Sequence, residues 1–576
     1  MMNAADLLQE RCNREATGIE MMINRLFFGL LFGAALLSAS GSSIAGGSDT
    51  LYVDGSIQTD HCRNYNPETR KCGGGKQVAY QALAGAAAVA VAGNKVLIRG
   101  GVYREILKPR HSGTKSKPLV FRGYKGETAI ISGEHLKPAI DISYRSHLIL
   151  ENIEVHDVRR WLYGRDADYN QIINCRFIGA HDPNGSSKTG LFFEQADHNR
   201  IINNLFDGTT QDNLSLVKSD SNLVQGNRFR NGKHTLWTIK CGNKNIIRGN
   251  DLYNELQKIG EIYDCHNVGF DHQFDDDDAT KHNLVEDNDF TYTPSSGRHS
   301  PYAGIQHAAQ QSIIRHNRFR HTIGPAMQLA LYGKEARYNS GNRIYNNTFH
   351  ATSFAAIEIA LGGKGYHLED NLLVNNAFTR SIFVVNDERW DWYNRFLRGA
   401  PVQIKTARLD GFFFDNNLIF NEKAGEFYLI AHGVRNSNRN PYPQSVSGWM
   451  KSNPELFRNF IEADPKYVDE GNNDFTPASG SPLLDSGRFL TRTRSAGSGT
   501  EIPVDDASWF QDGFDIPGEK GDEIQLQDQQ QRARILTVDY RSNRLTLDRP
   551  LRWKEGQGLA LSYNGKAPDI GAVEQP

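Results

Sequence analysis

Residues 201–253 read IINNLFDGTTQDNLSLVKSDSNLVQGNRFRNGKHTLWTIKCGNKNIIRGNDLY and contain three copies of one short unit. Each copy has apolar residues shortly before an asparagine and another apolar residue two positions after it. The asparagines, Asn204, Asn227 and Asn250, are 23 residues apart. This step is shorter than helical repeats of about 34 residues or more. The β-branched and aromatic residues, broken by Asn and Gly, instead indicate strands.

The unit recurs along the middle of the chain, with insertions that stretch the step to as much as 46 residues. Its asparagine slots are Asn152, Cys175 in place of asparagine, Asn204, Asn227, Asn250, Asn288, Asn317, Asn347, Asn371 and Asn417. Coils stacked about 4.8 Å apart would bury the apolar faces together. Asparagine at a fixed slot can occupy a left-handed turn and hydrogen-bond its copies. The pattern predicts an all-β protein, a right-handed parallel β-helix, and lacks the leucines of a leucine-rich repeat.

At these asparagine units the sequence resembles the pectate-lyase-like superfamily, over roughly residues 50–490. Residues 51–103 resemble its N-terminal cap, with a helix near 76–92 and a first strand at VLIRGGVY (96–103). Segments 463–469, 479–487 and 568–574 resemble the tail of exported β-helix proteins, the last as a closing strand. Residues 503–565 alternate as short strands and turns and predict a small antiparallel module. We favour a structural or docking role for this module.

Three domains are therefore expected: a pre-sequence and signal peptide (1–45), the β-helix with its cap (46–490), and a C-terminal segment (491–576). Residues 21–45 have one arginine, an apolar run and small residues, as in a secretory signal; a buried N-terminal helix is the alternative. We expect a secreted or periplasmic protein with no membrane span, and a monomer. The balance of 65 Lys+Arg against 67 Asp+Glu argues against a general nucleic-acid binder.

The cysteines fit export. Cys62 and Cys72 flank a polar loop and predict a local disulfide. Cys175, Cys241 and Cys265 lack CxxC spacing, so we interpret them as apolar core residues in preference to metal ligands.

Lys218 and Lys240 are 22 residues apart, about one coil, and should project from neighbouring coils of one wall. Two adjacent ammonium groups repel, which lowers the pKa of at least one. A lysine with a lowered pKa can act as a general base, as β-elimination from a uronic acid requires. Solvated lysines at strand ends are the alternative. His234 and Trp237 lie beside the pair, as a possible acid and a possible stacking platform, although Trp237 could equally pack against a loop.

The stretch 211–250 resembles the catalytic region of the family-six polysaccharide lyases, the alginate lyases and chondroitinase B. The resemblance implies that Lys218, in LVKSDSN, is the base, and Lys240, in LWTIKCGN, stands where the family has an arginine acid. It also implies a calcium site just before the lysine. Gln211 and Asn213 occupy those positions, and neutral ligands weaken a calcium site. We also expect Asn213 as a substrate contact.

A second cluster, residues 261–283, is rich in Asp, Glu and His. It is either a solvated acidic loop, or a cation or paired-carboxylate site. We expect His272 as an accessory acid or base and Asp271 as a substrate contact. A third cluster adds His299 and Tyr302 as substrate contacts, although lone histidines are more often structural.

The sequence therefore predicts an exported protein that acts on an acidic polysaccharide, and favours a lyase. Three alternatives stay open. A glycoside hydrolase would need two carboxylates at a set separation. A uronate epimerase would change sugar composition without shortening the chain. A non-catalytic protein would bind or assemble polysaccharide without turnover.

Overall fold

The computed structural model describes residues 49–184, 188–255, 258–263, 280–291, 303–322, 324–331, 339–352, 355–361, 368–381, 402–404, 409–421, 430–431 and 446–575. Residues 49–576 form one compact unit. The signal peptide expected at 1–45 lies outside the described residues. No helix in the described ranges is long and apolar enough to cross a membrane.

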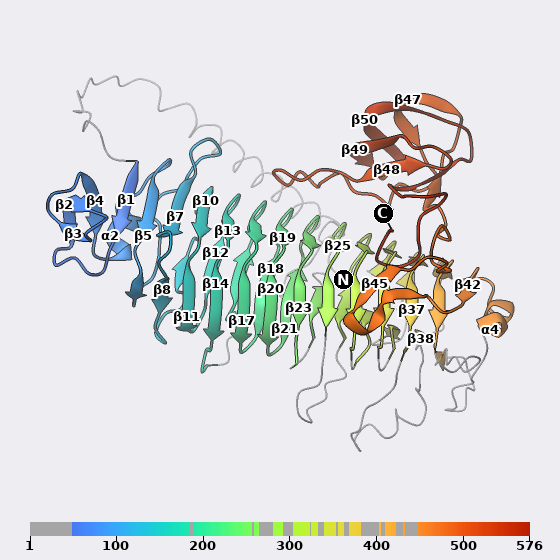
Figure 1. The fold of residues 1–576 in the computed structure, drawn as a ribbon, viewed down its shortest axis with the longest axis horizontal. Coiled ribbons are helices and arrows are strands. Elements are labelled where there is room, and N and C mark those ends of the chain that lie inside the picture. Colours follow the sequence, from blue (N-terminus) through green and yellow to red (C-terminus); the bar gives the residue numbers. More distant parts are fainter. Residues whose placement is uncertain are drawn as a thin grey trace, which may run out of the picture. The chain divides into compact units, whose positions relative to one another are not determined.

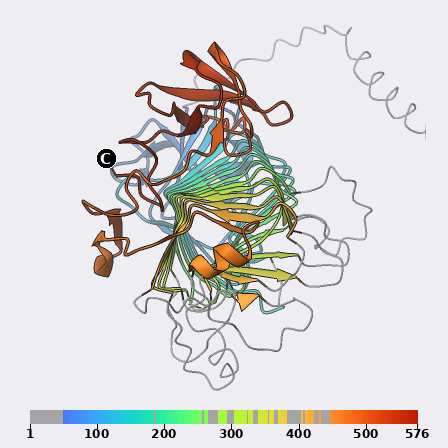
Figure 2. The same cartoon turned by 90° about the vertical axis from the view of Figure 1, so that its right-hand side faces the viewer.

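Most of this unit is a stack of coils whose strands form three parallel sheets, A, B and C (Figures 1 and 2). The parallel β-helix predicted from the asparagine units is confirmed. Sheet A contains β1 (Thr50–Val53), β5 (Lys95–Ile98), β7 (Leu119–Gly123), β10 (Leu148–Glu151), β13 (Gln171–Ile173), β16 (Arg200–Ile202), β19 (Leu223–Gln225), β22 (Ile246–Arg248), β25 (Leu284–Glu286), β28 (Ile313–Arg315), β32 (Arg343–Tyr345), β36 (Leu372–Val374), β39 (Phe413–Asp415) and β42 (Phe457–Arg458).

Sheets B and C follow sheet A in each coil. Sheet B contains β6 (Gly101–Tyr103), β8 (Ala129–Ser132), β11 (Glu154–Val158), β14 (Arg176–Ala180), β17 (Leu205–Thr209), β20 (Arg228–Gly232), β23 (Asp251–Tyr253), β26 (Asp289–Thr291), β29 (Arg318–Arg320), β33 (Thr348–His350), β37 (Ala377–Thr379), β40 (Leu418–Phe420) and β43 (Ile461–Glu462). Sheet C contains β9 (Ile140–Asp141), β12 (Leu162–Arg165), β15 (Leu191–Glu194), β18 (Asp212–Val217), β21 (Thr235–Lys240), β24 (Gly260–Tyr263), β27 (Ile305–Ala308), β30 (Met327–Leu331), β34 (Ile357–Leu361), β38 (Val402–Ile404) and β41 (Ile430–Ala431).

A ladder of buried asparagines marks the corner between sheets A and B. The backbone N–H of Asn227 donates to Oδ1 of Asn250 at 2.9 Å, and this bond repeats from coil to coil. The ladder contains Asn204, Asn227, Asn250, Asn288, Asn317, Asn347, Asn376 and Asn417. These amides satisfy backbone groups that the corner would otherwise leave unpaired in the core.

Three details of the asparagine prediction are corrected. Asn371 belongs to a second ladder, before sheet A, where its Oδ1 accepts the N–H of Asn342 at 3.1 Å. The slot after β36 is filled by Asn376. The left-handed turn occupies the residue before each ladder position, as at Asn203 (φ 55°), and Asn152 (φ 54°) is itself such a turn residue.

Inside the coils, like side chains stack on like. The rings of Phe177, Phe206 and Phe229 stack at centroid distances of 5.3 and 4.7 Å, and those of Phe290 and Phe319 at 4.5 Å. All are fully buried in one continuous core. The phenylalanines of the repeat therefore face inward, because each occupies the same position in successive coils.

The N-terminal cap differs from the expectation in its first strand and in its helix, because the strand expected at 96–103 is divided between β5 of sheet A and β6 of sheet B. The helix α2 covers only Leu83–Val89, because residues 77–80 form strand β4 (Gln77–Tyr80), which pairs with β1. Strand β4 also pairs antiparallel with β2 (His61–Asn66), and β2 with β3 (Lys71–Cys72). The predicted disulfide between Cys62 and Cys72 is confirmed, with Cα atoms 5.7 Å apart. A disulfide is typical of proteins outside the cytoplasm.

After the last coil come α4 (Val446–Ser452), the hairpin β44 (Tyr467–Asp469) and β45 (Asp474–Pro477), and an antiparallel module of six strands. The module order is β46 (Thr491–Arg492), β51 (Gly558–Leu561), β48 (Glu523–Leu526), β49 (Arg532–Asp539), β50 (Arg544–Trp553) and β47 (Gly497–Pro503). Residues 568–574 form no strand; this segment hydrogen-bonds through Ile570 to the carbonyl of Leu483.

The module docks on the outer face of sheet A. Its residues Ile502, Trp509 and Phe514 share an apolar cluster with Leu223 and Ile246 of the coils. A buried ion-pair network joins the two parts at Arg315. Its guanidinium binds Asp522 of the module at 2.7 and 2.8 Å and Glu286 of the preceding coil.

Candidate functional site

The outward face of sheet C over β18, β21 and β24 carries three of the polar residues that the sequence singled out, Lys218, Lys240 and His234; we call it the sheet C wall. In the register of these strands Ser215, Thr238 and Glu261 lie in one row. Val217, Lys240 and Tyr263 lie in the next outward row. The intervening residues, such as Leu216 and Ile239, point into the core. Strand alternation thus projects one set of side chains outward.

Lys218 and Lys240 lie on adjacent coils. The backbone N–H of Lys218 donates to the carbonyl of Lys240 at 2.8 Å. Lys218 follows the end of β18 in a left-handed conformation (φ 49°) and is exposed, whereas Lys240 is half-buried. Their spacing in the sequence therefore corresponds to one coil, and their catalytic roles stay a prediction.

His234 is held between two carboxylates on this wall. Its Nδ1 lies 2.7 Å from Oδ1 of Asp212, and its Nε2 lies 3.6 Å from Oε1 of Glu261. Asp212 is fixed in turn by the hydroxyl of Ser215, which donates to its Oδ2 at 3.1 Å. The imidazole side chain is 38% exposed, so it is accessible from solvent while its orientation is set from below. A buried carboxylate that orients a histidine is a common element of acid–base sites.

Lys258 is a member of this site that the sequence analysis missed. Its ammonium pairs with Glu261 and donates to Oε1 of Gln306 at 3.1 Å, and the side chain is only 8% exposed. Burial lowers the pKa of Lys258 to about 8; the carboxylate of Asp212 opposes this effect and the charge of Lys240 adds to it. The repulsion between neighbouring lysines that the sequence suggested for Lys218 and Lys240 thus acts between Lys240 and Lys258, where it lowers the pKa of Lys258. The only local signal in the sequence was Glu261 three residues after it.

A polar network continues from Lys258 along sheet C. The hydroxyl of Tyr263 donates to Oε1 of Glu261 at 3.3 Å and also contacts Gln306. Gln306 donates to Gln328 at 2.7 Å, and Gln328 donates to Glu358 at 2.6 Å. One outward row of successive coils contains Glu261, Gln306, Gln328 and Glu358. Such a network fixes the side chains of the wall before any ligand arrives.

Two expected substrate contacts are wrong. Trp237 is 1% exposed and points into the core. A side chain at Gly260 would clash with it, since a Cβ there would lie 2.2 Å from the indole. Asn213 is fully buried, with its Oδ1 accepting from Thr209 at 2.6 Å and its Nδ2 donating to the carbonyl of Arg230 at 2.8 Å. Both side chains serve the fold, since neither reaches solvent.

The calcium site expected at Gln211 and Asn213 does not fit the geometry, because the Asn213 amide is fully used by protein partners. The main-chain carbonyl of Gln211 accepts from Thr209 and from the N–H of His234. In the described part of the chain, no group of three or more His, Cys, Asp or Glu residues is arranged to hold a metal ion.

The remaining expected residues, His272, Asp271, His299 and Tyr302, lie outside the described residues. Cys175 is a free, buried core cysteine as expected. Cys241, at the end of β21 beside Lys240, is disulfide-bonded, which corrects its interpretation as an apolar core residue. Its partner lies outside the part of the chain described here.

Comparison with known proteins finds matches to parts of this chain. Residues 124–359 match the model of the family described as periplasmic copper-binding protein (NosD). An uncharacterized protein of Bacillus subtilis, YwoF, is 34% identical over 121 residues, which is 20% of this chain and 23% of that protein. Pectate lyase PEL9 of Emericella nidulans is 30% identical over 183 residues, 29% of this chain and 40% of the lyase. The chain thus spans less than half the length of these curated relatives.

Two solved structures are similar to this chain at low TM-scores. Pectate lyase Pel9A has a TM-score of 0.41 at 11% identity, covering 92% of this chain and 96% of that one. The family-six alginate lyase AlyGC has a TM-score of 0.40 at 16% identity, covering 72% of this chain and 61% of that one. The chain itself forms a parallel β-helix, as its three parallel sheets show.

Proposed function

We propose that this protein acts on an acidic polysaccharide at the sheet C wall and cleaves a uronate-containing chain by β-elimination. The observation that carries the proposal is that Lys218 and Lys240 lie on adjacent coils of one wall, which also carries the oriented His234 immediately before β21. Positive charge at this wall would attract a polyanion, which carries a carboxylate on each uronate.

Elimination requires three tasks of the protein. Lys218, in its neutral form, takes the proton from C5, and the electron pair left behind forms the C4–C5 double bond. Lys240 neutralises the adjacent carboxylate, whose negative charge increases as the C5 proton leaves. His234 donates a proton to the leaving glycosidic oxygen, and Asp212 holds the imidazole in position for this transfer.

Lys258 and Glu261 support the wall from beneath. Their pair is nearly inaccessible to solvent, so direct contact with a polymer is not expected. Glu261 also lies 3.6 Å from Nε2 of His234, so it helps to hold the imidazole in place.

The test is a panel of polygalacturonate, polymannuronate and polyguluronate, each with and without a chelator. A lyase forms an unsaturated product that absorbs in the near ultraviolet. Lys218→Ala should abolish that product and Asp212→Asn should reduce it strongly, whereas the exposed Lys125→Ala should leave it unchanged. Full activity in Lys218→Ala would refute the assignment. New reducing ends without unsaturation would indicate a hydrolase, and altered sugar composition at constant length an epimerase.

A second candidate is a non-catalytic periplasmic protein, because the match to the NosD family model spans the whole sheet C wall. The family's description names copper binding, so calorimetric titration of the protein with Cu²⁺ belongs beside the polysaccharide panel. Retention on a polyuronate column or saturable copper binding, with no product from any polymer, would favour this candidate.

A further inference from the structure

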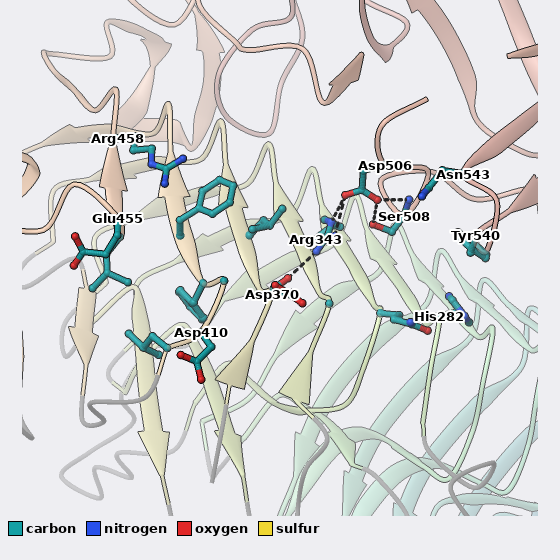
Figure 3. Close-up of a pocket in the computed structure, with 18 residues that line it drawn as sticks. His282, Arg343, Asp370, Asp410, Glu455, Arg458, Asp506, Ser508, Tyr540 and Asn543 are labelled. Carbon is teal, nitrogen blue, oxygen red and sulfur yellow. Dashed lines mark hydrogen bonds and ion pairs between the residues drawn. The ribbon is translucent and has the colours of Figure 1, made fainter. Parts of the chain in front are cut away.

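A separate cavity of about 720 Å³ lies where the module meets the later coils (Figure 3). We call it the junction groove. The coils contribute His282, Gln311, Arg343, Asp370, Asp410, Glu455 and Arg458, and the module contributes Asp506, Ser508, Tyr540 and Asn543. Its volume falls within the range of about 300–1,000 Å³ found for ligand pockets. It shares no lining residue with the sheet C wall.

The groove is elongated along the axis of the β-helix. The corner residues His282, Gln311, Gly341, Asp370 and Gly411 belong to successive coils, joined by backbone bonds such as that from Gln311 N–H to the carbonyl of Ser340. Glu455 and Leu456 extend the lining to a sixth coil, since Phe414 N–H donates to Leu456. The five spacings between six coils, each about 4.8 Å, add up to roughly 24 Å. An extended chain of several units matches this form better than a compact small molecule.

One end of the groove is rigid and polar. The guanidinium of Arg343 binds Asp506 at 2.9 and 3.1 Å and the carbonyl of Asp370 at 2.8 Å. The hydroxyl of Ser508 donates to the same Asp506 at 2.5 Å. His282 stacks on Tyr540 with ring centroids 4.5 Å apart. These side chains are fixed before a ligand binds, which reduces the entropy cost of recognition.

The floor between the polar groups is apolar. Leu372, Leu409, Phe412 and Leu456 line it, and the guanidinium of Arg458 lies over the ring of Phe413 at 5.1 Å. A sugar chain has the same division, because hydroxyl groups ring its edges while its C–H faces are apolar.

The charge of the groove selects against a uronate. Four carboxylates, those of Asp370, Asp410, Glu455 and Asp506, face two guanidinium groups. Burial lowers the pKa of His282 to about 4, so this ring is neutral at pH 7. The Asp370 and Glu455 side chains are exposed and make no ion pair within the described ranges of the chain. The carboxylates of Asp370 and Glu455 therefore disfavour a polyuronate beside them and attract ammonium groups.

We propose that the junction groove binds an oligosaccharide that carries amino groups, in addition to whatever the sheet C wall binds. Asp370 and Glu455 pair with ammonium groups of the sugar, while Ser508 and Asn543 hydrogen-bond its hydroxyls. The proposal is independent of catalysis at the wall, since the two sites share no residue.

The test is calorimetric titration of the full chain with a glucosamine tetramer at low salt. The double variant Asp370→Asn, Glu455→Gln should weaken binding at least tenfold. Glu462→Gln, an exposed carboxylate of β43 that does not line the groove, is the matched control and should bind as the unmodified protein does. The N-acetylated tetramer and a galacturonate tetramer should bind at least tenfold more weakly than the amine.

Several outcomes would overturn the proposal. These are no binding of the glucosamine tetramer, equal binding of its N-acetylated form, or full affinity in the double variant. Equal binding of tetralysine would also refute it, because the groove would then recognise charge alone. Circular dichroism of each variant establishes that the fold is intact before its affinity is interpreted.

Discussion

Asp522→Asn tests whether a buried charge holds the C-terminal module on the β-helix. The Asp522 side chain is 3% exposed and that of Arg315 is 4% exposed. Asp522 accepts two bonds from Arg315, at 2.7 and 2.8 Å, and one from the Gln511 side chain at 2.6 Å. Replacing the carboxylate with an amide leaves the guanidinium with Glu286 as its remaining anionic partner. Breaking a buried pair on one side costs about 3–5 kcal/mol.

We expect Asp522→Asn to make docking of the module less favourable by about 3 kcal/mol. This value is toward the lower end of the range because Glu286 remains as a partner of Arg315. Hydrogen exchange of residues 532–553, which form β49 and β50, measures this loss as faster exchange under native conditions. Asp505→Asn is the matched control. Its carboxylate is exposed and lies 3.9 Å from Arg494, so its removal should cost less than about 1 kcal/mol.

The reasoning would be refuted if Asp522→Asn and Asp505→Asn exchanged at the same rate in these strands. Equal rates would mean that the apolar contacts of Trp509 and its neighbours hold the module without the ion pair. Faster exchange confined to Asp522→Asn, with unchanged exchange in β17 and β20, would locate the effect at the junction.

Three further predictions follow from single features of the coils. Burial depresses the pKa of Lys258 to about 8 from its ordinary 10.5. Between these pH values the unfolded chain binds more protons than the folded chain, so the free energy of unfolding rises with pH. Urea unfolding from pH 7.5 to 10.5 should show a steeper rise in the unmodified protein than in the double variant Lys258→Met, Glu261→Gln. Asn288→Ala should lower the free energy of unfolding by about 3–5 kcal/mol, because it leaves the Asn250 N–H and the Ile247 carbonyl unpaired in the core. The exposed Asn472→Ala should lower it by less than about 1 kcal/mol in the same urea assay. Removing the Cys62–Cys72 disulfide, which closes a short loop, should lower the free energy of unfolding by about 3 kcal/mol, and equal unfolding midpoints for the unmodified protein and the double variant Cys62→Ser, Cys72→Ser would contradict this.

The repeat was readable from the sequence because its cause is local. An asparagine slot, an apolar pair before it and a phenylalanine or aliphatic residue after it recur from coil to coil, and each serves the same role at the same corner. The disulfide and the antiparallel strands of the module were also visible as local spacing and alternation. Errors arose where two nearby positions carried the same residue type, as with Asn371 and Asn376, since spacing alone could not separate the two ladders.

The tertiary structure decided which side chains face outward and which residues of different coils become neighbours. Trp237 sits among polar residues in the sequence, yet Gly260 on the next coil leaves room for its indole in the core. Lys258 gains its lowered pKa from burial and from the charge of Lys240, against the opposing charge of Asp212, and these two residues lie 18 and 46 positions earlier in the chain. The junction groove unites residues from six coils with a module that the sequence placed at the end of the chain. Local hydrogen-bonding patterns fix how each coil is made, but burial and charge depend on which coils and insertions cover a side chain, and those contacts exist only after the coils have stacked.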